Sequence, residues 1–303
     1  MNPRVVTALS VTILLWASAF AAIRMALGAF SPGPLALFRF AVASAALALY
    51  GSLRGARLPR KEDLPALALC GLLGVAYYHV SLNYGQVKVK AGVAAFLINT
   101  SPIFTALLAR FYLKEKLRPI GWIGMFVSVS GVVLLALKEG QGFSIEASAL
   151  LIVSSAVAAS IYTVRQKSLL EKYTALEFTT YACCAGTFFM LVFLPRCLRE
   201  MSTAPLTVTL AVVYLGLFPA ALGYACWSYI LSQLPASTAV SYMYIVPVMA
   251  MAIAWIFLDE RPGPLALPGG VLALLGVILV QRYGRVSAAV PEPAAEASAV
   301  AAK

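Results

Sequence analysis

Ten apolar runs of about 20 residues follow one another along this 303-residue chain. A helix of about 20 residues crosses the roughly 30 Å hydrocarbon core of a bilayer. The ten runs use most of the chain, so the connections between them must be short. The sequence therefore predicts an all-α integral membrane protein with ten transmembrane helices, at about residues 5–27, 33–53, 64–86, 91–113, 119–137, 145–168, 174–195, 207–231, 236–258 and 264–281.

The composition supports a membrane protein and indicates its orientation. Only 12% of the residues are charged, whereas a soluble domain has about 25%. The net charge of +11 comes from basic residues that cluster in the short connections rather than on one nucleic-acid-binding face. If the N-terminus is cytoplasmic, fourteen Lys and Arg lie on the cytoplasmic side and six on the other. Basic residues favour the cytoplasmic side, so both termini are expected there.

The chain contains an internal repeat. A shift of 145 residues aligns 91–134 with 236–279 without a gap, and 11 of the 44 aligned positions are identical. The identities include prolines within the predicted helices, a Leu-x-Glu at a helix end and paired glycines. Five spans in each half is an odd number, so the second copy must enter the membrane from the opposite face. We expect repeats at 1–140 and 141–285, and a disordered cytoplasmic tail at 286–303.

Several segments resemble a known family. These are LLWASAFAAIRMAL in the first span, PLALFRF in the second, and LKEKL…GWIGMFVSVSGVVLL with its echo LDERP…GGVLALLGVILV. Together they look like the ten-helix EamA branch of the drug/metabolite transporter superfamily, and are similar to bacterial exporters of aromatic and other amino acids of the YddG type. The resemblance implies two inverted five-helix halves and export of small metabolites across a bacterial-type inner membrane. The sequence departs from the family at Ile161 and Tyr162, where a tryptophan is usual, and in lacking an arginine that matches Arg39 in the seventh span.

A polar cluster in the third span predicts part of a substrate site. His79 is the only histidine of the chain, and an ionisable group in hydrocarbon is expected to face the bundle interior or water. Asn83 lies one helical turn further on the same face, and Tyr78 lies beside that face. The repeat places Tyr224 at the position equivalent to His79, with Trp227 on the next turn.

The prolines of the two repeats predict a pair of kinked helices near the centre of the bundle. A proline frees a backbone carbonyl one turn upstream, which a polar group or a substrate then satisfies. Asn99 and Ser101 precede Pro102, and Tyr244 precedes the equivalent Pro247. Kinked helices at corresponding positions of two repeats are typical of a transporter's central site.

Three further side chains are open to two interpretations. Trp16 lies deep in the first span, where it either packs in the core or lines the cavity. Arg24 and Arg39 are expected near the ends of spans one and two, and either extend toward the interface or bind a carboxylate at the outer mouth. A shift of 141 residues pairs Arg24 with Arg165.

These observations predict an exporter that works by alternating access. Its cavity is expected between spans 1, 3, 4, 6, 8 and 9, and we place no Asp or Glu within it. Export of cationic or apolar drugs is the alternative; a water-filled pore and an integral-membrane enzyme fit less well. Transport is either facilitated or coupled to protons through His79. We expect a small-molecule substrate and the bilayer as partners, no cofactor, metal or nucleic acid, and a chain compatible with a monomer.

Overall fold

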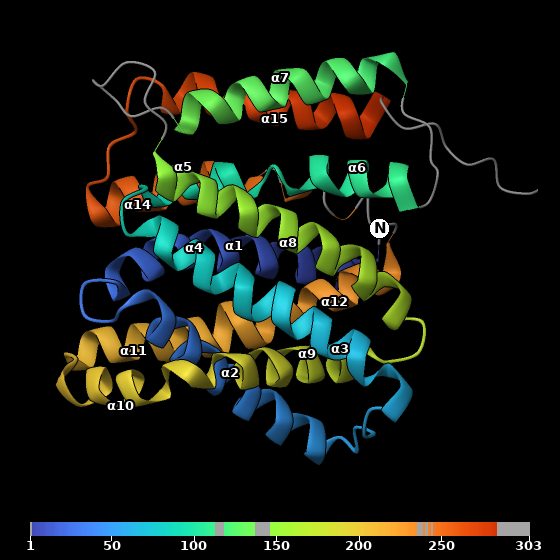
Figure 1. The fold of residues 1–303 in the computed structure, drawn as a ribbon, viewed down its shortest axis with the longest axis vertical. Helices are drawn as coiled ribbons and strands as arrows, with labels where there is room; N and C mark the ends of the chain where they lie inside the picture. The colour runs from blue at the N-terminus through green and yellow to red at the C-terminus, as the bar shows by residue number, and fades with distance from the viewer. Residues whose placement is uncertain are drawn as a thin grey trace, which may run out of the picture.

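A computed structural model describes residues 2–112, 118–136, 146–234, 239, 242–243 and 245–283. In this part of the chain the regular structure is helical, with no β-strand (Figure 1). The first half contains α1 (Pro3–Ala26), α2 (Pro32–Leu53), η1 (Lys61–Asp63), α3 (Leu64–Cys70), η2 (Gly71–Tyr77), α4 (Tyr78–Gln86), α5 (Ala91–Ile98), α6 (Ser101–Tyr112) and α7 (Pro119–Ala136). The second half contains α8 (Ala147–Leu169), α9 (Ala175–Met190), η3 (Leu191–Phe193), α10 (Leu194–Thr203), α11 (Leu206–Leu215), η4 (Gly216–Leu222), α12 (Gly223–Gln233), α14 (Ile245–Leu258) and α15 (Ala266–Tyr283).

Among the described residues, six continuous helical segments are long and apolar enough to cross a bilayer. They are Pro3–Ala26, Pro32–Leu53, Lys61–Gln86, Ala147–Leu169, Ala175–Thr203 and Leu206–Gln233. Shorter apolar segments lie where the fourth, fifth, ninth and tenth spans are expected, at Ala91–Thr105, Pro119–Gly131, Ile245–Leu258 and Ala266–Leu279. The prediction of a helical, multi-span protein is thus confirmed, and the count of ten spans stays a prediction. The expected tail at 286–303 lies outside the described residues.

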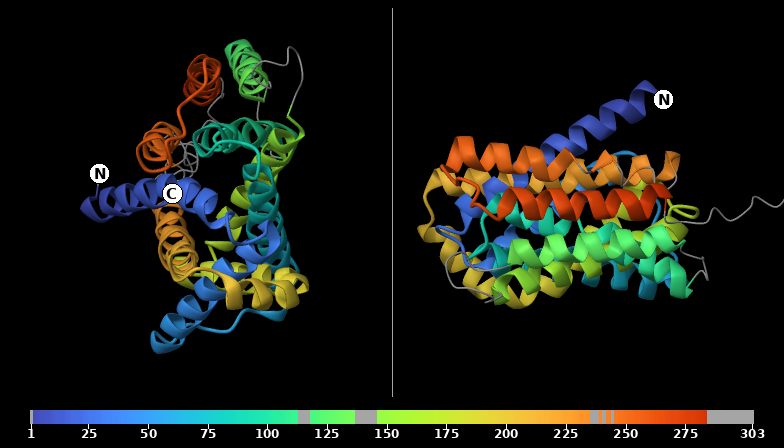
Figure 2. Two further views of the ribbon diagram at one scale, coloured as in Figure 1. Left: turned by 90° about the vertical axis from the view of Figure 1, so that its left-hand side faces the viewer. Right: turned by 90° about the horizontal axis from the view of Figure 1, so that it is seen from above.

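The outer surface of the bundle is rich in large apolar side chains. Phe126 on α7 is 75% exposed and Phe257 on α14 is 76% exposed, and Trp122 and Trp255 are half exposed. Such a surface promotes aggregation in water, whereas lipid tails are as apolar as these side chains. Most helices run side by side in one general direction, as helices that cross one bilayer do, whereas the start of α1 projects from the bundle (Figure 2).

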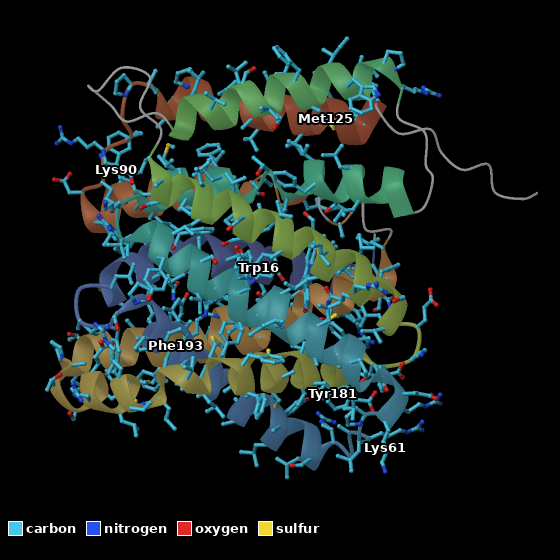
Figure 3. The ribbon with its side chains drawn as sticks, in the orientation of Figure 1. Trp16, Lys61, Lys90, Met125, Tyr181 and Phe193 are labelled. Atoms are coloured by element: carbon cyan, nitrogen blue, oxygen red, sulfur yellow. The ribbon has the colours of Figure 1, made fainter. Side chains whose placement is uncertain are left out.

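Charged residues gather at the two ends of the bundle. Lys61 and Lys90 lie at opposite ends in Figure 3, and the start of α1 and the end of α15 both lie at the Lys61 end (Figures 1 and 2). At the Lys61 end, Lys172 Nζ donates to Asp63 Oδ1 at 2.7 Å, and this bond raises the pKa of Lys172 above its ordinary value. At the other end, Lys90 Nζ donates to the carbonyl of Arg261 at 3.0 Å. The connections therefore alternate between the two ends.

Two π-helical segments lie 145 residues apart, at the same shift as the sequence repeat. They are η2 and η4, each seven residues long within an otherwise α-helical span. A π-helical turn accommodates an extra residue within an α-helix, and it is frequent at functional sites. His79 follows η2 and Tyr224 follows η4 by the same interval.

Helices α7 and α15 pack against each other as a separate layer at the top of Figure 1. A Cβ atom on Gly131 would collide with the backbone of Ala273, and a Cβ atom on Gly276 would collide with the backbone of Ser128. Ser128 Oγ also donates to the Ala273 carbonyl at 3.0 Å. Both the glycines and this bonded pair are 145 residues apart, so the contact is reciprocal, as between two objects related by a two-fold axis. Glycine is needed here because the two backbones approach closely.

A second pair of equivalent contacts corrects one prediction. Arg24 Nη1 donates to the Gln86 carbonyl at 2.6 Å, and Lys167 Nζ donates to the Leu231 carbonyl at 2.7 Å. Gln86 and Leu231 are 145 residues apart, so Lys167 is the counterpart of Arg24. Arg165, which the shift of 141 selects, is exposed. Two basic residues close together on one helix made the alignment ambiguous there.

The two prolines lie near the starts of helices α6 and α14. Pro102 is the second residue of α6, after the chain leaves α5 at Ile98, and Pro247 is the third residue of α14. In the first turn of a helix the missing N–H of proline has no intrahelical partner to lose. The helix is thus interrupted just before Pro102, whereas a kink at Pro247 stays a prediction, because residue 244 lies outside the described residues.

Candidate functional site

A cavity of about 130 Å³ lies among helices of both repeats. Trp16 lines it and lies in the middle of the bundle in Figure 3. Helix α2 contributes through Arg39, although the expected set of spans omits the second. No Asp or Glu occurs among the described residues of the lining. Seven of the predicted substrate-binding residues line this space: Trp16, Tyr78, His79, Asn99, Ser101, Tyr224 and Trp227.

A chain of hydrogen bonds joins the two repeats on one wall of the cavity. Arg39 Nη1 lies 3.4 Å from His79 Nδ1, and His79 Nε2 lies 2.8 Å from the Tyr224 hydroxyl. The Tyr224 hydroxyl in turn donates to the Gly74 carbonyl at 3.3 Å. A guanidinium can only donate, so Nδ1 must accept and Nε2 must carry the proton. The network therefore assigns a neutral imidazole to His79.

Aromatic rings form a second wall. The Trp16 ring centroid lies 5.4 Å from that of Trp227 and 5.8 Å from that of Tyr224. Trp16 Nε1 donates to the Pro219 carbonyl at 3.2 Å, inside the π-helical segment η4. Trp16 thus both packs against the other repeat and lines the cavity, which resolves the two interpretations of this residue. Aromatic faces of this kind hold apolar groups and cations.

Tyr162 on α8 is a cavity residue that the candidate set omitted. Its ring packs over Gly74, where a Cβ atom would collide with it. Its hydroxyl is buried and has no hydrogen-bond partner. Trp16 reaches the π-helical segment of the second repeat, and Tyr162 reaches that of the first. The signal was in the sequence, because Tyr162 is one residue from the repeat equivalent of Trp16 and stands where the family usually has a tryptophan.

Arg39 is the other cavity residue that the candidate set omitted, and the structure excludes one of its two interpretations. The side chain does not extend to the interface. It is 3% exposed, lines the cavity and lies 5.3 Å from the centre of the Phe40 ring. Its Nε atom is buried without a hydrogen-bond partner. The surrounding helices decide this burial, so the position of Arg39 along α2 did not reveal it.

Asn83 is buried but does not line the cavity. Its Nδ2 donates to the Pro32 carbonyl at 3.0 Å, and its Oδ1 has no partner. The amide turns toward the start of α2, so it does not share a lumen with His79 as the one-turn spacing predicted. Pro247 is buried on α14 outside the lining, and Tyr244 lies outside the described residues.

The break between α5 and α6 brings Asn99 and Ser101 to the cavity. Asn99 Nδ2 donates to the Ala95 carbonyl at 3.0 Å, which also accepts the backbone N–H of Asn99. Ser160 Oγ on α8 donates to the Ser101 carbonyl at 2.7 Å, so a side chain of the second repeat holds the chain next to this break. The Ser101 carbonyl also accepts the Thr105 hydroxyl at 3.0 Å, so both carbonyls have partners within the protein. The site as a whole offers aromatic faces, neutral hydroxyl and amide groups, and one buried cation.

Comparisons with known proteins agree with this architecture. The model of the EamA-like transporter family matches twice, over residues 4–137 and 147–282. A probable terminal-alkyne amino-acid exporter of Streptantibioticus cattleyicolor is 41% identical over 279 residues, covering 92% of this chain and 94% of that protein. The uncharacterized transporter YdfC of Bacillus subtilis is 42% identical over 268 residues, with 88% of each chain covered. One solved crystal structure has a TM-score of 0.63 at 21% identity, covering 92% of this chain and 96% of that one, a likeness of fold.

Proposed function

This chain belongs to the EamA-like transporter family, and from that premise we propose that it exports small metabolites, most of all amino acids including aromatic ones. It acts by alternating access through the cavity between its two repeats. The ten spans form two inverted five-helix halves, and both termini face the cytoplasm of a cell with a bacterial-type plasma membrane. Known relatives are named transporters, in keeping with a protein that moves its substrate without chemical change.

The observation that carries the proposal is the contact between His79 and Tyr224 in the cavity wall. The two residues occupy equivalent positions of the two repeats, and their side chains bond at 2.8 Å. Two repeats related by symmetry rock against each other around a shared midplane site in alternating access. A substrate bound in this cavity contacts both repeats, so its binding depends on how the repeats are positioned relative to each other.

The residues that line the cavity favour an amino acid over a cationic drug as the substrate. The described lining has no carboxylate to neutralise a cation, and it includes the positive charge of Arg39. Trp16 and Trp227 offer flat faces to an apolar or aromatic side chain. A relative at 41% identity is named as a probable amino-acid exporter, although of a particular amino-acid type.

A substrate panel in proteoliposomes tests the proposal. Purified protein is reconstituted, preloaded with one unlabelled amino acid and assayed for counterflow of the labelled compound; amphipathic cations are tested as competitors. We expect counterflow of amino acids and little competition by cations. Trp16→Ala should slow amino-acid counterflow, whereas Trp122→Ala, the same change on the exposed face of α7, should leave the counterflow rate unchanged. Competition by cations without amino-acid counterflow would favour drug export, and single-channel current would favour a pore.

Cysteine labelling in whole cells tests the orientation. Single cysteines replace Lys61 and Lys90, which lie at opposite ends of the bundle (Figure 3), in a variant without the five native cysteines. A membrane-impermeant maleimide should react from outside at position 90 and not at position 61. The reverse pattern would contradict a cytoplasmic N-terminus.

A further inference from the structure

Arg39 is a buried cation with no carboxylate beside it among the residues that the structure describes. Its guanidinium lies 3.4 Å from the His79 imidazole and over the face of the Phe40 ring. The acidic side chains buried in the described structure are Asp63 and Glu177. Asp63 binds Lys172 and Tyr173, and Glu177 binds backbone and side-chain groups of neighbouring loops. Neither of these two carboxylates lines the cavity.

Such a charge is unfavourable unless something compensates for it. Removing a charged group from water costs several kcal/mol, and pairing with an opposite charge or satisfying its hydrogen bonds offsets this. The long bond to a neutral imidazole and the Phe40 ring compensate only in part, and Nε of Arg39 is left without a partner. An anion that enters the cavity would meet this requirement. A guanidinium binds a carboxylate in particular through two parallel hydrogen bonds.

We infer that Arg39 is the binding site for the carboxylate of the transported solute. The inference rests on the proposed function and narrows it to small solutes that carry a carboxylate, with amines and amides excluded. The unpartnered hydroxyl of Tyr162 is a second donor in the same cavity. Trp16 and Trp227 then face the rest of the solute, which matches an amino acid with an apolar side chain.

The inference is tested with matched solutes that differ only at the carboxyl group. Counterflow is measured for phenylalanine, phenylalaninamide and phenethylamine, and for alanine, alaninamide and ethylamine. The wild-type protein should carry an acid at least about tenfold faster than its amide or amine, because a charge-assisted bond to Arg39 is lost in both analogues. Acid and amide carried at equal rates would overturn the inference and leave the exporter standing. Absence of counterflow for every compound would overturn the proposed function, and the inference with it.

Substitutions of Arg39 test whether this residue causes the preference for the acid over the amide. Arg39→Gln should lower acid counterflow to the level of the amide and leave the amide rate unchanged, while Arg39→Lys should keep part of the preference. Arg54→Gln, on the exposed end of the same helix, is the matched control and should behave as wild type. A purely structural role for Arg39 would lower all rates together, and that result would contradict the inference. If Arg39→Gln does not fold, Arg39→Lys and the wild-type series still decide.

A bound chloride ion is the other anion that could neutralise Arg39. It would act as a fixed counter-ion, so transport would require chloride and acid and amide would be carried alike. The counterflow series is therefore repeated with nitrate in place of chloride. Unchanged acid preference without chloride supports the carboxylate site. Loss of transport without chloride, together with equal rates for acid and amide, would overturn it.

Discussion

His79 Nε2 and the Tyr224 hydroxyl lie 2.8 Å apart, although 145 residues separate them in the chain. That interval is the period of the internal repeat, so equivalent positions of the two halves bond directly to each other. Two equivalent side chains meet only where a two-fold relation brings each half onto the other. The bond therefore lies where the halves must move relative to each other if the protein alternates its access.

Tyr224→Phe should destabilise the protein. It leaves His79 Nε2 without its acceptor, the Tyr224 hydroxyl, and a buried unsatisfied polar group costs about 1–3 kcal/mol. Thermal unfolding of the detergent-solubilised protein measures the loss. Tyr84→Phe, on an exposed tyrosine, is the control. Equal unfolding temperatures for both variants would show that the bond contributes little.

A double-mutant cycle separates the His79–Tyr224 bond from other effects. If the two side chains act through this bond, the combined change of His79→Ala and Tyr224→Phe should destabilise by less than the sum of the single changes. The coupling expected for residues in direct contact is about 0.5–3 kcal/mol. Strict additivity would contradict a direct interaction.

Gly74→Ala should also destabilise the protein, by overpacking. The new methyl group collides with the Tyr162 ring, and added atoms in a packed core cost about 1–3 kcal/mol. Adding Tyr162→Ala removes that collision, so the double variant should be destabilised by less than the sum of the two single changes. Gly51→Ala, where a Cβ atom would make only ordinary contacts, should be neutral. A neutral Gly74→Ala would mean that the two helices separate easily here.

Glu260→Gln should loosen the Lys90 end of the bundle. Glu260 Oε1 pairs with Arg24 of the first repeat at 2.9 Å, and Oε2 accepts the N–H of Ala91 at 2.8 Å. These bonds join α1 and α5 of the first repeat to the chain that follows α14, so removing the charge should favour a state open at this end. The exposed pair of Arg60 and Glu62 contributes little to stability, so Glu62→Gln is the control.

Spin labels at Val87 and Arg261 measure this opening in the same protein. Both positions lie at the Lys90 end and are exposed. Pulsed electron paramagnetic resonance should show a longer label-to-label distance in a larger fraction of molecules with Glu260→Gln than in wild type. An unchanged distance distribution would contradict a closing role for the Arg24–Glu260 pair.

A pH gradient alone should not drive uphill uptake of an amino acid. His79 Nδ1 faces a guanidinium that only donates, so the imidazole is neutral and a second positive charge beside Arg39 would be repelled. Reconstituted protein is given a pH step across the membrane at equal substrate concentrations on both sides. Accumulation against the gradient that is lost in His79→Ala would instead establish coupling through this residue.

Much of the fold follows from local properties of the chain. Apolar runs must become helices in lipid, because no water is present to satisfy an open backbone. The spacing of Gly131 and Gly276 within the repeat identifies a close helix contact. The same repeat pairs His79 with Tyr224, and most of the predicted aromatic and polar candidates do line the cavity.

The orientation of side chains around each helix did not follow from the sequence. A membrane helix is apolar on faces that meet lipid and on faces that meet other helices, so periodicity does not separate the two. Asn83 was therefore expected in the cavity, and Arg39 either at the interface or at the outer mouth. The prolines were expected within continuous helices, because a break of two residues inside an apolar run leaves no change in composition.

Hydropathy, charge placement and the repeat of 145 residues determined by themselves that this chain is a helical membrane protein with two related halves. These are properties of neighbouring residues and of their copies along the chain. Only the tertiary structure decided that Arg39 is buried beside His79, that Tyr162 joins Trp16 in the wall, and that Asn83 turns away. Each of these depends on which helices pack together, because neighbouring helices determine whether a side chain meets lipid, protein or the cavity.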